Sequence, residues 1–126
     1  MSADHRLTFY NQSHHVMTLT RNDGQCQCMT SKGPGAFTIA PGGTYVVMLE
    51  DTDDYKKGCQ NVTKTVGWNV TENGGNSRNL VYNAFVSHDG VSVTGDIIYA
   101  MSNGSACVSY CWADRSGVPI PVDIYL

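Results

Sequence analysis

The stretch that decides the fold is residues 37–50, with the sequence FTIAPGGTYVVMLE. Two β-rich runs, 37–40 and 44–50, flank the turn Pro41-Gly42-Gly43. Proline fixes its own φ and disfavours the helical region for the residue before it, and glycine accepts positive φ without a steric cost. The second run is β-branched and aromatic with almost no polar interruption, which predicts a strand buried on both faces. The stretch therefore predicts two strands joined by a turn.

The rest of the chain repeats this pattern of strand, turn and strand. Two further turns, Asn22-Asp23-Gly24 and His88-Asp89-Gly90, carry hairpin signals, because Asn, Asp and Gly tolerate the positive φ that such turns require. The most polar stretch, 51–61, is predicted to be the longest loop. The other predicted strands are 7–11, 15–21, 25–30, 62–71, 80–87, 91–99, 107–113 and 122–126.

The run 62–71 is the clearest amphipathic strand. Lys64 and the apolar residues Val62, Val66, Trp68 and Val70 share one face, and mostly Thr and Asn take the other. This alternation predicts a sheet with one face in a core and one in water.

Length and composition favour a single domain, 1–126, of the all-β class. The chain has 126 residues and 13 glycines. Only 15% of its residues are charged, against ~25% in an average domain. We expect an antiparallel β-sandwich of about nine or ten strands, with a closed barrel as the alternative.

Charge and hydropathy exclude some partners. The net charge is −3, the sequence pI is about 5.7, and the largest basic cluster is Lys56-Lys57, so nucleic acid is not an expected partner. No apolar run approaches the ~20 residues of a membrane span. The polar start of the chain has no secretory h-region, so we expect either a cytoplasmic product or a protein whose leader has been removed.

The five cysteines are Cys26, Cys28, Cys59, Cys107 and Cys111, and an odd number leaves at least one thiol unpaired within the chain. Cys26 and Cys28, two residues apart on one predicted strand, are poorly placed to bond each other. Any disulfide must therefore join different strands, and Cys59 in the predicted loop is the best placed partner. The pairing itself stays open.

No motif for catalysis, a metal or a cofactor stands out. Asp51, Asp53 and Asp54 resemble the start of a calcium loop but lack its closing Glu, so a solvated acidic loop is the favoured interpretation. The cysteine spacings do not match a zinc site. Ser87-His88-Asp89 are sequence neighbours on a turn and cannot assemble a triad. We therefore expect no enzyme, no metal and no cofactor.

The aromatic residues are the remaining candidates for binding. Seven Tyr and two Trp can supply an amphipathic surface. Tyr55, in the polar loop, is the aromatic residue expected to be most exposed. Trp68 and Trp112 are also binding candidates, although strand alternation favours the core for both.

Several segments resemble aegerolysin-type proteins. They are Met1-Ser2-Ala3, Asn11-Gln12-Ser13 with the following run 15–19, and Ala40-Pro41-Gly42-Gly43 before a strand. The resemblance covers residues 1–50. The second half departs from the family, and Cys107 and Cys111 have no counterpart, so no functional residue is carried over. The resemblance implies a β-sandwich that binds membrane lipids selectively, often as one component of a two-component pore-forming or insecticidal toxin that acts outside the cell.

Three functions therefore stay open. The first is a non-enzymatic recognition protein that binds a membrane lipid or surface receptor, with a second protein component as a further partner. The second is a small inhibitor or immunity-type protein whose acidic loop, 51–54, enters a basic cleft. The third is a glycan-binding module in which an exposed aromatic ring stacks on a sugar.

Overall fold

The computed structural model describes residues 4–60, 62–75, 77–86, 91–95 and 120–126. The regular structure of these residues is β, apart from one short 3₁₀-helix, η1 (Tyr55–Lys57). The strands are β1 (Asp4–Tyr10), β2 (Met17–Gln27), β3 (Met29–Ser31), β4 (Ala36–Ile39), β5 (Thr44–Asp51), β6 (Lys64–Glu72), β7 (Ser77–Val86), β8 (Val91–Gly95) and β9 (Ile120–Tyr125). The predicted all-β class is confirmed.

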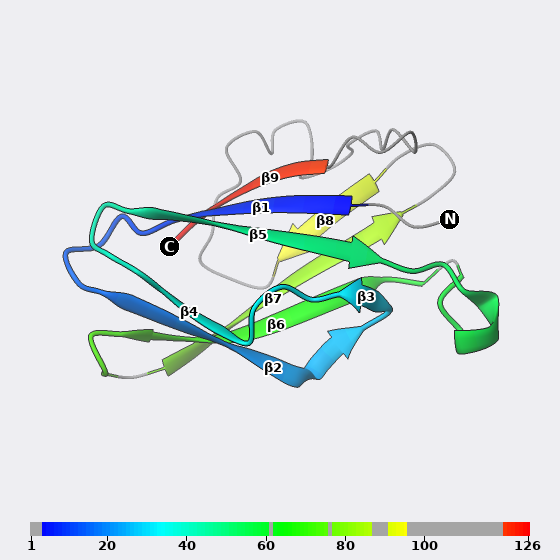
Figure 1. Ribbon diagram of the computed structural model, residues 1–126, viewed down its shortest axis with the longest axis horizontal. Helices are drawn as coiled ribbons and strands as arrows, with labels where there is room; N and C mark the ends of the chain where they lie inside the picture. The colour runs from blue at the N-terminus through cyan, green and yellow to red at the C-terminus, as the bar shows by residue number, and fades with distance from the viewer. Residues whose placement is uncertain (1–3, 61, 76, 87–90, 96–119) are drawn as a thin grey trace.

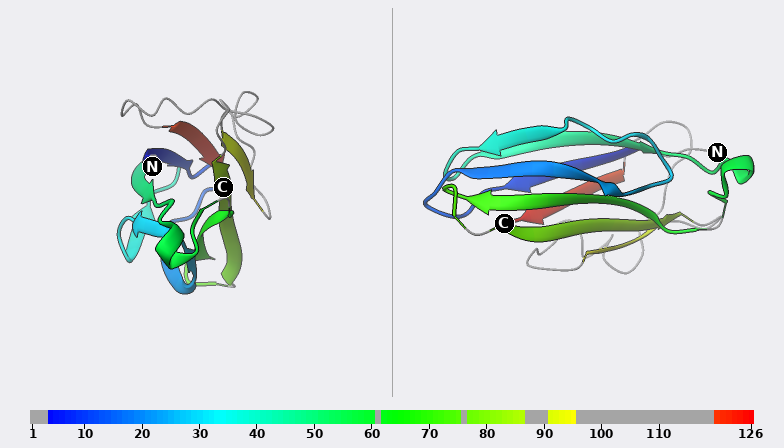
Figure 2. Two further views of the ribbon diagram at one scale, coloured as in Figure 1. Left: turned by 90° about the vertical axis from the view of Figure 1, so that its right-hand side faces the viewer. Right: turned by 90° about the horizontal axis from the view of Figure 1, so that it is seen from below.

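The described strands form two sheets. The β1 sheet has the order β3-β5-β1-β9, and the β2 sheet has the order β4-β2-β6-β7-β8 (Figure 1). Figure 2 shows the two sheets as layers that face each other. Inward side chains of both layers form one hydrophobic cluster that includes Leu7, Phe9, Leu49, Trp68 and Ile124. Burial of this shared apolar surface holds the layers together.

The sequence predicts antiparallel pairing throughout, and this is wrong for one pair of strands. β9 runs parallel to β1, with Val122 beside Leu7 and Ile124 beside Phe9. All four side chains are buried. The parallel register therefore extends the inner face of the β1 sheet with two more apolar side chains from the end of the chain.

The turn Pro41-Gly42-Gly43 links the sheets rather than closing a hairpin. Gly42 has φ +72°, as the sequence predicts, but β4 belongs to the β2 sheet and β5 to the β1 sheet. The buried Asn11 fixes this crossing: its backbone bonds to Gly42 and Gly43, and its side-chain amide donates to the carbonyls of Ile39 and Ala40. The turn therefore sets the connection between layers.

β5 is buried on one face only, so the prediction of a strand buried on both faces is wrong. Val47 and Leu49 are 1% exposed, whereas Val46 is 49% and Met48 43% exposed. The unbroken apolar run arises because β5 carries apolar residues on the outer face of its sheet as well as on the inner one.

The predicted hairpin at Asn22-Asp23-Gly24 is also wrong. β2 continues through these residues, and its register with β6 shifts between the pairs Asn22–Gly67 and Gln27–Thr65. The Asn22 side chain accepts a hydrogen bond from the Gly24 N–H at 3.1 Å, so the turn-forming residues build a bulge inside the strand. The chain reverses instead at Cys28, where φ is +59°.

Three predicted strands reach beyond the described residues. The strand expected at 80–87 is described as far as Val86. The strand expected at 91–99 is described as far as Gly95, and the strand expected at 107–113 lies outside the described residues together with Cys107, Cys111 and Trp112. In the part of the chain that the structure describes, no helix is long and apolar enough to span a membrane.

Candidate functional site

Three buried polar side chains connect the two sheets by hydrogen bonds at one end of the molecule. His5, at the start of β1, lies with Nε2 2.6 Å from Asp51 Oδ2 and with Nδ1 2.7 Å from Tyr82 Oη. Asp51 ends β5, whereas Tyr82 comes from β7 in the opposite sheet. The three side chains are 0%, 0% and 1% exposed. A buried histidine needs partners for both ring nitrogens, and each sheet supplies one.

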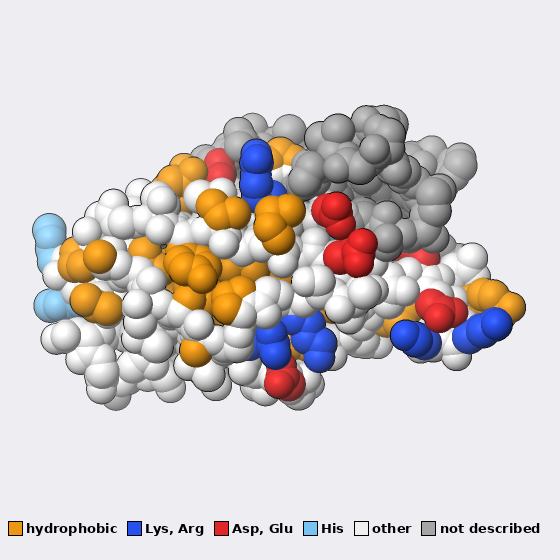
Figure 3. Space-filling view, in the orientation of Figure 1, with side chains coloured by type: hydrophobic (Ala, Val, Ile, Leu, Met, Phe, Trp, Pro, Cys, Tyr) orange, Lys and Arg blue, Asp and Glu red, His pale blue; other side chains and the backbone are white. Residues whose placement is uncertain are grey.

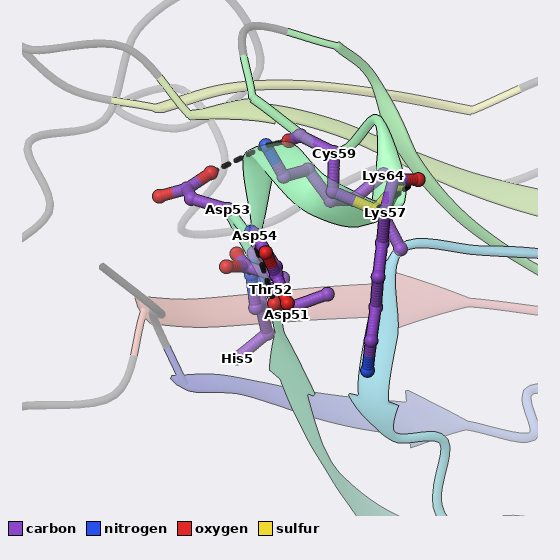
Figure 4. Close-up of polar contacts among 9 residues, drawn as sticks. His5, Asp51, Thr52, Asp53, Asp54, Lys57, Cys59 and Lys64 are labelled. Atoms are coloured by element: carbon purple, nitrogen blue, oxygen red, sulfur yellow. Dashed lines mark hydrogen bonds and ion pairs between the residues drawn. A yellow bond between two sulfur atoms is a disulfide. The ribbon is translucent and has the colours of Figure 1, made fainter.

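Lys64 forms a second buried contact at the same end (Figure 4). Its Nζ donates to Asp53 Oδ1 at 2.7 Å and to the Cys59 carbonyl at 3.0 Å. The Lys64 side chain is fully buried and that of Asp53 is 15% exposed. The sequence placed Lys64 on the inward face of its strand, and the ion pair explains how a charge is tolerated there.

The acidic loop is turned inward rather than solvated, which corrects the favoured interpretation of 51–54. Asp51 contacts His5, Asp53 contacts Lys64, and Asp54 accepts a hydrogen bond from the Lys56 N–H at 2.9 Å and so caps η1. Carboxylates engaged in this way offer little negative charge to a basic cleft. A disulfide between Cys28 and Cys59 also holds the loop. The sequence predicted a bond between strands, but both cysteines lie outside the strands.

The chemistry open to this cluster is limited. Both ring nitrogens of His5 are engaged, so neither can take a proton from a substrate in this geometry. Within the described ranges, no three His, Cys, Asp or Glu side chains gather as metal ligands would. The cluster links the two sheets through buried hydrogen bonds.

The predicted binding residues do not share one surface. Tyr55 lies in η1 and is 69% exposed, whereas Trp68 is fully buried and packs edge-on against Phe9, with ring centroids 5.3 Å apart. Asp51, Asp53 and Asp54 have the internal contacts given above. Trp112 lies outside the described residues.

A different surface, which sequence reasoning missed, lies on the outer side of the β1 sheet. We call it the tyrosine face and define it by outward side chains of three neighbouring strands: Arg6, Thr8, Tyr10, Val46, Met48, Pro121, Asp123 and Tyr125. In Figure 3 hydrophobic side chains gather over β1, β5 and β9. Alternation within 44–50 was the signal that could have found it.

Two tyrosines anchor this face. The rings of Tyr10 and Tyr125 stack with centroids 4.6 Å apart and an angle of 13° between their planes. Tyr10 Oη donates to Asp123 Oδ1 at 3.2 Å. Partial burial, followed by the nearby Asp123 carboxylate, raises the pKa of Tyr10 above its ordinary value. The phenol therefore stays protonated well beyond neutral pH.

Aliphatic side chains continue the tyrosine face. Val46 pairs with Thr8, and Met48 pairs with Arg6, which in turn lies beside Pro121 of β9. Val46 and Met48 are nearly half exposed. Exposed aliphatic side chains beside a stacked aromatic pair form a surface suited to a partly apolar partner.

Comparison with known proteins adds no relative: no family model, no curated protein and no solved structure matches this chain.

Proposed function

We propose that this protein is a non-enzymatic β-sandwich recognition protein that binds a membrane lipid through the tyrosine face. The observation that carries the proposal is the exposure of Val46 and Met48 beside the stacked pair Tyr10 and Tyr125. Tyrosine rings combine an apolar body with a polar tip and suit the boundary between lipid headgroups and acyl chains. Aliphatic neighbours add apolar area that binding would remove from water.

The charge on the tyrosine face favours neutral or zwitterionic lipid. Arg6 is its one basic side chain among the described residues, while Asp123 lies on the face and Asp4 and Glu50 pair with each other at its border. Anionic membranes attract surfaces with several Lys or Arg residues. We therefore expect sphingolipid or phosphatidylcholine, with or without sterol, to be bound in preference to anionic lipid.

The resemblance to aegerolysin-type proteins supports the same proposal and extends it. In that extension the protein acts outside the cell as the lipid-recognising component of a two-component pore-forming toxin, and a second protein completes the pore. The disulfide between Cys28 and Cys59 is compatible with an extracellular setting.

The test is co-sedimentation of the purified protein with vesicles of varied sphingolipid, sterol and anionic lipid content. We expect selective binding to zwitterionic vesicles and at least a tenfold weaker affinity in the double variant Val46→Thr, Met48→Gln. Both substitutions keep the size of the side chain and remove its apolar character. Asn69→Thr, an exposed change on the outer face of the β2 sheet, is the matched control.

Two outcomes would overturn the proposal. One is a wild-type protein that binds none of the vesicles, which would direct the search to a protein receptor. The other is a double variant that binds as tightly as the wild type, which would remove the tyrosine face from the site.

A further inference from the structure

A polar groove lies against the other sheet, beside the bulge of β2. It has a volume of about 440 Å³ and is lined by Gln25, Cys26, Gln27, Thr65, Val81 and Asn83, with Gly24 at the bulge. These residues belong to the neighbouring strands β2, β6 and β7. The register shift of β2 against β6 coincides with the groove. The bulge, which the sequence suggested as a hairpin, therefore shapes this surface.

The wall of the groove at Gln25 is held in place by paired amides. Gln25 Nε2 donates to Asn79 Oδ1 at 2.9 Å, and Asn79 Nδ2 donates back to Gln25 Oε1 at 2.7 Å. Asn79 Nδ2 also lies 3.2 Å from the Trp68 carbonyl, which fixes the pair to β6. Such reciprocal bonds hold both amides in one orientation before any ligand arrives.

Gly67 makes this arrangement possible. Gly67 is buried on β6, and a Cβ atom added there would overlap the Gln25 side chain. The missing side chain lets Gln25 lie flat against the sheet. A glycine inside a strand weakens it, and close approach of another group is one reason for its presence.

The second wall offers hydrogen bonds to a ligand. Thr65 Oγ1 donates to Asn83 Oδ1 at 3.1 Å. Because a primary amide has two donors as well as its oxygen, Asn83 can still donate from its amino group. The exposed Gln27 adds a further amide, and Val81 supplies an apolar contact. Cys26 also lines the groove and packs against the hydrophobic core. The lining thus combines amide donors and acceptors, a hydroxyl and apolar atoms.

The lining contains no acidic or basic side chain. A charged ligand would lose its hydration without gaining an opposite charge, which is costly. A neutral ligand with many hydroxyl groups matches the amides as donors and acceptors. Pockets for small ligands commonly measure ~300–1,000 Å³, and this volume of about 440 Å³ fits one or two sugar rings.

We propose that this groove binds a neutral saccharide. Gln27 and Asn83 donate and accept hydrogen bonds, Gln25 forms a fixed wall, and Val81 contacts the apolar side of the sugar. The site lies on a different sheet from the tyrosine face, so it does not depend on lipid binding. It also differs from an aromatic stacking site, since its recognition comes from amides.

The first experiment screens the protein against an array of neutral and sialylated glycans, followed by calorimetric titration of the best neutral binder. We expect Gln27→Ala and Asn83→Ala each to weaken binding at least tenfold, and Gly67→Ala to do the same by displacing Gln25. Asn69→Ala, also outward on β6 but outside the lining, should leave affinity unchanged.

Cys26 allows a second measurement of saccharide binding, made on the wild-type protein. It is the free cysteine among the described residues and it lines the groove. The bound saccharide should slow alkylation of Cys26 by iodoacetamide, followed by peptide mass spectrometry. Because Gln27 is exposed, its variant should fold normally even if Gly67→Ala does not.

The proposal is overturned if no neutral glycan binds, or if Gln27→Ala and Asn83→Ala both bind as tightly as the wild type. Tighter binding of sialylated than of neutral glycans would also overturn it, because the neutral lining predicts the opposite order.

Discussion

At the scale of the residue, His5 forms buried hydrogen bonds to side chains of both sheets. It is contacted by Asp51 from its own sheet and by Tyr82 from the opposite sheet, and all three side chains are buried. Burial of polar groups is tolerated only where hydrogen bonds replace the lost water. The cluster therefore stabilises one particular alignment of the sheets.

Removing one hydrogen bond from this cluster should destabilise the fold without abolishing it. We expect Tyr82→Phe to lower the free energy of unfolding by about 1–2 kcal/mol, and His5→Leu, which removes both contacts, by about 3 kcal/mol or more. Urea denaturation measures both. Tyr45→Phe is the control, since Tyr45 is a half-buried tyrosine stacked on Phe37. Equal stability of Tyr82→Phe and wild type would contradict a role for the hydroxyl.

Tyr10 gives the folded protein a dependence on alkaline pH. Its pKa is raised above 10.0 by partial burial and by Asp123, so the folded state holds the phenol proton more tightly than the unfolded state. The resulting stabilisation is complete below the ordinary pKa and is lost as the pH rises through the raised pKa. Unfolding midpoints measured from about pH 9 to about pH 11.5 should fall less steeply in Tyr10→Phe. Parallel curves for the two proteins would refute the assignment.

At the scale of the element, β5 carries two neighbouring valines on opposite faces. Val47 is 1% exposed and Val46 is 49% exposed. Val47→Ala should cost about 1–3 kcal/mol, because it leaves a cavity in the shared core. Val46→Ala should cost less than about 0.5 kcal/mol. Chemical denaturation measures the unfolding free energy of both variants, and each variant is the control for the other. Similar losses in both variants would mean that β5 is buried on both faces, as its sequence alone suggested.

The bulge in β2 shows why local sequence signals predicted a hairpin turn where the strand continues. Asn22-Asp23-Gly24 has the composition of a hairpin turn, and its local hydrogen bond from Gly24 to Asn22 does form. The strand nevertheless continues, because Gln27 pairs with Thr65 on β6. Only the position of β6, a distant segment of the chain, decides between a turn and a bulge.

At the scale of the whole molecule, the disulfide joins two connections between sheets. Cys28 separates β2 from β3, which lie in different sheets, and Cys59 lies between β5 and β6, which do as well. The bond closes a loop with a sequence separation of 31 residues. It therefore restrains the unfolded chain and fastens the end of the molecule that holds the acidic loop.

Loss of this bond should be measurable in the stability of the whole protein. We expect the double variant Cys28→Ala, Cys59→Ala to lose about 2–4 kcal/mol of unfolding free energy. Reductant should lower the unfolding midpoint of the wild type and leave that of the double variant nearly unchanged. A wild-type midpoint that reductant does not alter would show that the bond contributes nothing to stability.

The sequence by itself determined the all-β class, most strand positions, and the inward side of β6 with Trp68 and Lys64. These features follow from alternation and turn chemistry, which act between neighbours in the chain. Tertiary structure alone decided the partners of Asp51, Asp53 and Lys64, the parallel β9, the tyrosine face and the groove over Gly67. Each of these depends on which distant strands become neighbours, and pairing between strands is set by burial of the whole core rather than by any local pattern.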